Sequence, residues 1–122
     1  MIRRAFAGDL PEIIALAKSI GGAMTKHLSV KPLKPDLLLG VETPKKILLD
    51  EEYGVFSRNL AMLRRTPGWV VLVEGPCVDN FFEYNRLQDR SVSLDGRYFP
   101  RRVQQYSDAV YEGLTRWVEG KD

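Results

Sequence analysis

The clearest pattern of apolar positions in the chain is a helical stripe near its C-terminus. Its residues recur mostly at steps of three and four: Val103, Tyr106, Val110, Leu114, Trp117 and Val118. Such spacing places side chains on one face of an α-helix. Pro100 suits the start of this helix, and Gly120 suits its end. Gly113 lies inside the run, where a glycine either weakens the helix or marks a close contact.

A second helical pattern lies near the N-terminus, behind a short alternating stretch. Ile2–Phe6 alternates as an edge strand does. Asp9 then occupies the position of an N-cap, with Glu12 three residues further on. Apolar residues follow at helical spacing: Leu10, Ile13, Ile14, Ala17 and Ile20. The pattern predicts a strand at residues 2–6 and a helix from Asp9 to Ile20, which Gly21-Gly22 would end.

The middle of the chain carries helical and strand signals in turn. Between Pro44 and Arg65 the apolar spacing predicts one helix broken at Gly54, or two short helices. Trp69–Glu74 opens with five apolar residues in a row, mostly β-branched or aromatic, which is typical of a strand buried on both faces. Val78–Leu87 follows a Gly-Pro turn and is predicted to be its antiparallel partner.

A hairpin is predicted directly before the last helix. Ser91–Leu94 and Arg97–Phe99 are short strand-like runs, and Asp95-Gly96 between them is a strong signal for a two-residue turn. At 122 residues the chain has the length of one domain, residues 1–122. The element order predicts a mixed α/β or α+β fold with a mostly antiparallel central sheet flanked by helices.

The opening stretch also resembles a known family. Residues 2–17 read I-R-x-A-x-x-x-D-L-P-x-I-x-x-L-A, which is similar to the first strand and helix of the GCN5-related N-acetyltransferases. The resemblance implies an acetyltransferase-like domain that uses acetyl-coenzyme A to acylate an amine. Small chains that resemble this family occur in phage genomes, some of them as virion-associated proteins. A well-capped strand–helix opening of any other fold is the alternative reading of the same residues.

The segment that would hold the cofactor departs from the family's pattern. The family binds pyrophosphate with a Q/R-x-x-G-x-G/A loop at a helix N-terminus, and the corresponding stretch here is Leu94–Val103. It has one glycine, Gly96, and bulky residues where backbone should approach phosphate. Its basic residues Arg97, Arg101 and Arg102 are the candidate cofactor contacts. The chain therefore resembles a short, degenerate member with at most weak acyl-coenzyme A-dependent N-acyltransferase activity.

Few residues suggest catalysis or metal binding. Glu83 and Tyr84 lie on the predicted central hairpin and are the candidate base and acid, although such residues also serve as sheet-packing or solvated positions. His27 is the only histidine, so a multi-histidine metal site is excluded. Cys77 is the only cysteine, which excludes an internal disulfide and fits a reducing cytoplasm. The sequence leaves open whether the protein is an enzyme.

Composition narrows the remaining alternatives. The net charge is only +2, from 18 basic and 16 acidic residues, which argues against nucleic acid or an anionic membrane as the main partner. No apolar run is long enough for a membrane span. A second hypothesis is a non-enzymatic binding or structural protein on the same fold, with a protein partner or a second copy, in the cytoplasm or a virion. A third is a small nucleic-acid-binding module that uses the Arg97–Arg102 cluster.

Overall fold

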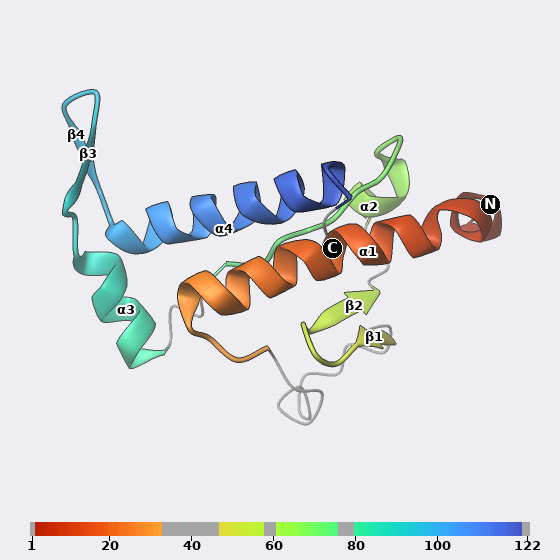
Figure 1. The fold of residues 1–122 in the computed structure, drawn as a ribbon, viewed down its shortest axis with the longest axis horizontal. Coiled ribbons are helices and arrows are strands. Elements are labelled where there is room, and N and C mark those ends of the chain that lie inside the picture. The colour runs from red at the N-terminus through yellow and green to blue at the C-terminus, as the bar shows by residue number, and fades with distance from the viewer. Residues whose placement is uncertain (1, 33–46, 58–60, 76–79, 121–122) are drawn as a thin grey trace.

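Two long helices that lie side by side dominate the structure (Figure 1). The computed structural model describes residues 2–32, 47–57, 61–75 and 80–120. The long helices are α1 (Ile2–Leu28) and α4 (Arg101–Val118). The shorter elements are β1 (Ile47–Asp50), β2 (Val55–Ser57), α2 (Ala61–Arg65), α3 (Phe81–Gln88), β3 (Val92–Leu94) and β4 (Arg97–Phe99). The predicted mixed α+β class is confirmed, but the described strands form two separate two-stranded antiparallel sheets rather than one central sheet.

The N-terminal strand and the cap at Asp9 are wrong predictions. Helix α1 begins at Ile2, so Asp9 lies inside it, and Pro11 is tolerated within the helix. Gly21-Gly22 does not end the helix either. These glycines instead allow a close contact. A Cβ atom at Gly21 would lie 2.9 Å from the Cβ of Tyr53, so glycine lets the turn of the β1–β2 hairpin approach the helix. The helix continues to Leu28, and Ser29 follows with a left-handed φ of 53°.

Helices α1 and α4 approach closely because small residues line their contact. Ala23 of α1 and Ala109 of α4 are fully buried there. The hydroxyl of Ser19 donates a hydrogen bond of 2.7 Å to the carbonyl of Gly113. A Cβ atom at Gly113 would lie only 2.5 Å from the Cα of Ile20. Gly113 therefore marks a close helix contact, which is the second of the two roles that the sequence allowed.

Much of the helix predicted between Pro44 and Arg65 is a hairpin. Strands β1 and β2 pair antiparallel with Ile47 opposite Ser57. The backbone N–H of Tyr53 donates to the carboxylate of Asp50 at 3.0 Å, and Gly54 has a φ of 65°. A side-chain hydrogen bond and a left-handed glycine make a turn more stable than a continued helix. Residues 44–46 and 58–60 lie outside the described part of the chain, and α2 alone is helical as predicted.

The predicted central strand pair is also absent from the described residues. Trp69–Glu74 has no strand pairing, and Trp69 instead packs edge-to-face on Trp117 with ring centroids 5.1 Å apart. Of its expected partner Val78–Leu87, residues 78–79 lie outside the described part of the chain, and Phe81–Leu87 belongs to α3. The side chain of Asn80 caps this helix by accepting from the N–H groups of Phe82 and Glu83. A β-prone segment forms a strand only where another strand offers hydrogen bonds.

The C-terminal predictions are confirmed. Strands β3 and β4 pair in the expected register, with Val92 opposite Phe99. The turn residues Asp95 and Gly96 have φ angles of 50° and 75°, which is the backbone of a type I′ turn. Helix α4 follows Pro100 directly, and Gly120 ends it with a φ of 64°. In Figure 1 this hairpin stands up from the N-terminal end of α4.

Candidate functional site

A buried ion pair between Arg102 and Glu83 joins three helices. Arg102 is 3% exposed, and its Nε donates to Glu83 Oε2 at 2.8 Å. Its Nη2 donates to the other oxygen of the same carboxylate. Its Nη1 donates to the carbonyl of Leu28, the last residue of α1, and to Gln105, each at 3.1 Å. The guanidinium therefore connects the C-terminal end of α1 with α3 and α4, and we call this arrangement the Arg102 clasp.

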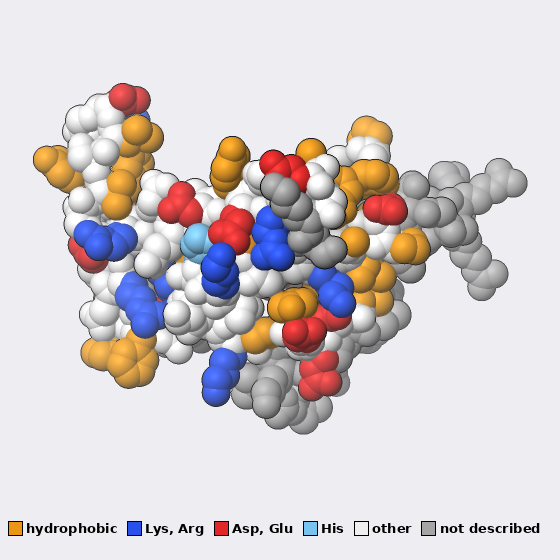
Figure 2. Space-filling model, in the orientation of Figure 1, with side chains coloured by type: hydrophobic (Ala, Val, Ile, Leu, Met, Phe, Trp, Pro, Cys, Tyr) orange, Lys and Arg blue, Asp and Glu red, His pale blue; other side chains and the backbone are white. Residues whose placement is uncertain are grey.

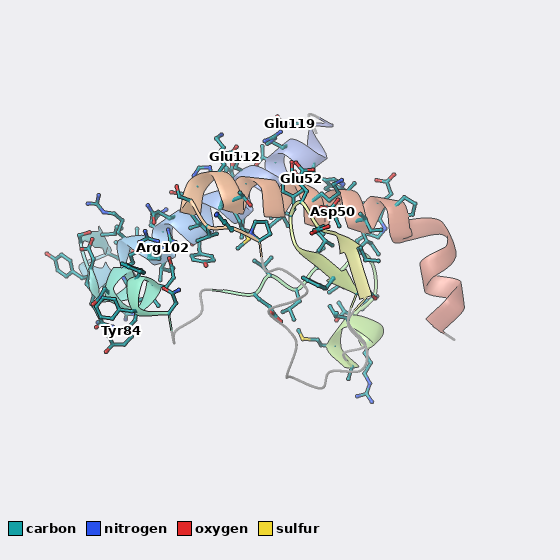
Figure 3. The ribbon with its side chains drawn as sticks, turned by 90° about the horizontal axis from the view of Figure 1, so that it is seen from below. Asp50, Glu52, Tyr84, Arg102, Glu112 and Glu119 are labelled. Atoms are coloured by element: carbon teal, nitrogen blue, oxygen red, sulfur yellow. The ribbon has the colours of Figure 1, made fainter. Side chains whose placement is uncertain are left out.

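Glu83 is held in its charged form by the clasp. Hydrogen bonding from Arg102 lowers the pKa of Glu83, and Arg86 adds a second hydrogen bond at 2.7 Å. Both carboxylate oxygens are thus engaged within the protein. Tyr84, the candidate acid, lies on α3 with more than half of its side chain exposed (Figure 3). Both residues are helical, not part of a central hairpin as predicted, and a catalytic role for either stays a prediction.

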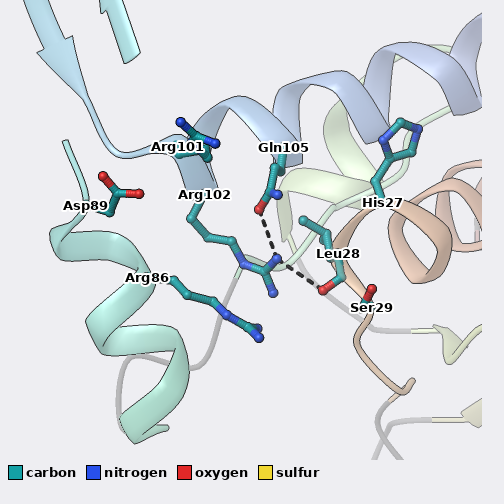
Figure 4. A pocket seen from close by; sticks show the side chains of 8 residues that line it. All are labelled: His27, Leu28, Ser29, Arg86, Asp89, Arg101, Arg102 and Gln105. Atoms are coloured by element: carbon teal, nitrogen blue, oxygen red, sulfur yellow. Dashed lines mark hydrogen bonds between the residues drawn. The ribbon is translucent and has the colours of Figure 1, made fainter. Parts of the chain in front are cut away.

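A polar pocket of about 250 Å³ lies beside the clasp (Figure 4). Eight residues line it: His27, Leu28, Ser29, Arg86, Asp89, Arg101, Arg102 and Gln105. Two of the three arginines that the sequence proposed for a cofactor meet here, whereas Arg97 lies apart on strand β4. The guanidinium of Arg101 donates to the hydroxyl of Ser91 at 3.2 Å. The pocket offers arginine side chains to an anion, but Asp89 also lines it.

The N-terminus of α4 is partly occupied by the protein's own backbone. The N–H of Arg101 donates to the carbonyl of Asp89 at 2.9 Å, and the N–H of Val103 donates to Pro100 at 3.0 Å. The N–H groups at a helix start are those that hold a phosphate in the acetyltransferase pattern. Since two of them have internal partners, this end of α4 has fewer donors left for a ligand.

A second charged cluster joins α1 to the middle of α4. Glu112 contacts His27 and forms a 3.0 Å ion pair with Lys26. Hydrogen bonding from His27, then from Lys26, lowers the pKa of Glu112 to about 2. His27 thus has a structural contact, in line with the ordinary role of a lone histidine. Among the described residues no group of three His, Cys, Asp or Glu side chains could hold a metal ion.

The outer face of α4 is apolar and largely uncovered. Val103, Leu114 and Val118 are exposed, although the sequence placed them on one stripe with Tyr106, Val110 and Trp117. A shallow apolar groove of about 440 Å³ runs along this face: its lining is Tyr106, Ser107, Val110, Tyr111 and Leu114. Helix α1 packs on the neighbouring face, through Ala109 and Gly113. The small residues Ala109 and Gly113 mark the side of α4 that α1 covers.

Further exposed apolar residues lie at the same end of the molecule as the clasp. They are Leu94, Tyr98 and Phe99 of the hairpin, and Phe81 and Phe82 of α3. The space-filling view shows hydrophobic side chains on the hairpin and along the edge above α4 (Figure 2). Cys77, the other residue of chemical interest, lies outside the described part of the chain.

Comparison with known proteins adds no relative to this picture. No family model matches the chain, and neither a curated protein nor a solved structure is detectably similar to it. The acetyltransferase resemblance therefore depends on the quoted residues alone, and the acyl-coenzyme A cofactor stays a prediction. None of the described helices is both long and apolar enough to cross a membrane.

Proposed function

We propose that this chain is a non-enzymatic binding protein that presents an apolar surface to a protein partner. The observation that carries the proposal is the mismatch between its core and its surface. Large apolar side chains of the described residues are exposed on α3, on the β3–β4 hairpin and on α4, among them Phe81, Tyr98 and Val118. Few apolar side chains are fully covered among the described residues: Leu16, Ile20, Ala23, Leu28 and Ala109.

The chemistry of the charged groups supports binding over catalysis. A general base works best when its pKa lies near the operating pH. The carboxylates of Glu83 and Glu112 instead have lowered pKa values, because each accepts hydrogen bonds from basic side chains. Their evident task is to join α1, α3 and α4. The exposed apolar face of α4 is then the feature that has no internal use.

A second candidate is the binding of a phosphate-bearing ligand such as acyl-coenzyme A. It is favoured by one observation, the shared pocket of Arg86, Arg101 and Arg102. Only this second candidate function requires an acetyltransferase-like sheet to complete the site. The hydrogen bond from the N–H of Arg101 to Asp89 counts against it, because that donor is already used.

An apolar dye separates the two candidates. We expect 1-anilinonaphthalene-8-sulfonate to fluoresce with the folded protein and to lose that signal on cooperative unfolding, since a built apolar surface requires the fold. A thioester-cleavage assay with acetyl-coenzyme A and polyamines should release no thiol. A folded protein that binds no dye, or one that steadily releases thiol, would contradict the proposed function.

A further inference from the structure

Trp69–Val73 is an extended apolar stretch that no described strand accompanies. It follows α2, and the chain has neither a turn nor a bend through residues 69–75 on its way toward α3 (Figure 1). Its five residues are all apolar, and all but Leu72 are β-branched or aromatic. Such residues favour a pleated, extended backbone. The stretch therefore has the composition and the extended course of a β-strand, but it belongs to neither sheet.

The backbone of this stretch has no hydrogen-bond partner within the described part of the chain. None of the backbone hydrogen bonds of its sheets, turns and loops reaches Trp69–Val73. Each of these residues carries one N–H donor and one C=O acceptor, and along a strand successive residues direct these groups to opposite edges. Both edges of the stretch are thus left to water or to another chain.

The side chains of the stretch are anchored without being fully covered. Trp69 packs edge-to-face on Trp117 of α4, yet it remains 47% exposed, and Leu72 is 39% exposed. The three valines of the stretch are half-buried. A continuous apolar run of this kind is typically buried on both faces in a sheet. The described chain therefore covers less of this run than a sheet would.

An extended peptide would satisfy both the backbone and the side chains, whereas a partner helix would satisfy the side chains alone. A helix uses its own backbone groups internally. It would cover Trp69 and Leu72 but would leave the N–H and C=O groups of the stretch without hydrogen bonds, which costs free energy. An added strand offers donors and acceptors at the matching spacing, together with side chains of its own.

The sequence on either side limits the length of strand that can be added. Pro67-Gly68 precedes the stretch, and Gly75-Pro76 follows it. Proline lacks a backbone donor, so pairing cannot extend far past either end. Five residues remain between these limits and Glu74, which is about the length of an average strand. We infer that Trp69–Val73 receives an extended, largely apolar segment of a protein partner by strand addition; this inference rests on the proposed function.

Amide hydrogen exchange in the presence of a model peptide tests the inference. The probe is a synthetic peptide in which valine and threonine alternate between terminal lysines, added to the whole chain. We expect the amides of Trp69–Val73 to exchange rapidly in the free protein. With the peptide, alternate amides should exchange about tenfold more slowly or less, because an added strand pairs with one edge. Slow exchange of all these amides in the free protein would overturn the inference, since their hydrogen bonds would then be internal.

A second peptide separates backbone pairing from simple apolar contact. It has the same side chains, but each valine and threonine carries an N-methyl group, so that its backbone has lost those donors. We expect it to bind at least about tenfold more weakly, which corresponds to the loss of one or more hydrogen bonds. Equal affinity for the two peptides would overturn strand addition, because contact between apolar side chains does not require the peptide's N–H groups.

Proline substitutions identify the edge that is used. Val70→Pro and Val71→Pro each remove one N–H, and in a strand these two groups lie on opposite edges. Neither variant loses a hydrogen bond within the described protein, so thermal melts should show that both fold. One of the two should bind the first peptide about tenfold more weakly. Val70→Thr and Val71→Thr are the matched controls, since threonine is β-branched and keeps its N–H. Unchanged affinity in both proline variants would overturn the placement.

The outcomes separate the inference from the function on which it rests. A folded protein that binds the apolar dye but neither peptide overturns strand addition and leaves the proposed function standing, with the partner on another surface. Alternate protection that appears without peptide and grows with protein concentration places a second copy of the chain on the stretch, which overturns the separate partner. A folded protein that binds neither dye nor peptide overturns both.

Discussion

Arg102 is the residue on which α1, α3 and α4 converge. Its guanidinium is buried and binds the carboxylate of Glu83 through two nitrogens while it also donates to the carbonyl of Leu28. The sequence suggested both residues, but as a phosphate contact and a base. Their pairing spans nineteen positions and depends on α3 being a helix, so no local pattern revealed it.

Removing one member of the clasp should destabilise the fold strongly. Glu83→Gln leaves a buried guanidinium without its counter-charge, and breaking a buried pair costs about 3–5 kcal/mol. Urea denaturation measures the change. Arg86→Gln is the control, because half of the Arg86 side chain is exposed and its loss should cost far less. A loss of stability in Glu83→Gln as small as the loss in Arg86→Gln would mean that the clasp is not a stabilising contact.

Glu112 should make stability depend on acid pH. Its pKa is about 2 in the folded protein, below its ordinary value of 4.5. A lowered folded pKa gives stability that is fully present above 4.5 and is lost as the pH falls toward 2. Melting temperature measured across that window should therefore fall less steeply in Glu112→Gln than in the wild type. Parallel curves would show that the contacts with His27 and Lys26 do not stabilise the folded state.

At the scale of elements, predictions that depended on neighbouring residues were confirmed, and the prediction that depended on pairing with a distant strand was wrong. The turn at Asp95-Gly96 has its φ angles set by its own residues, and the last helix has its own stop at Gly120. Trp69–Glu74 needed a partner strand, and the cap at Asn80 turned that partner into α3. In the candidate site, the closeness of Arg101 and Arg102 could be predicted only because the two residues are adjacent in the sequence. The exposure of the α4 stripe could not be predicted, since a periodic pattern does not say which neighbour covers it.

The contact between α1 and α4 should not tolerate a side chain at Gly113. Gly113→Ala gains about 1 kcal/mol of helix propensity. It also sets a Cβ 2.5 Å from the Cα of Ile20, and backbone cannot yield cheaply. We expect a net loss of about 1–3 kcal/mol, the usual cost of overpacking, measured by urea denaturation. Gly75→Ala is the matched control, because its Cβ would meet nothing within 4 Å. A stabilised Gly113→Ala protein would argue against close helix contact.

At the scale of the whole molecule, the fold divides its residues between two tasks. Ion pairs and small residues join α1, α3 and α4. Large apolar side chains remain outside, on α4, on the β3–β4 hairpin and on α3. This distribution is typical of an interaction surface and differs from a catalytic pocket, which is concave and holds convergent polar groups.

The same distribution predicts that the protein binds acetyl-coenzyme A weakly. In the pocket, Arg101 offers an exposed contact to phosphate, and exposed pairs contribute about 1 kcal/mol or less each. A dissociation constant of 1 mM already requires about 4 kcal/mol, so calorimetric titration should detect binding no tighter than that. Arg101→Ala should then change the titration little, and Arg97→Ala is its control outside the pocket. A low micromolar constant abolished by Arg101→Ala alone would identify a working cofactor site, and it would return the acetyltransferase hypothesis to first place.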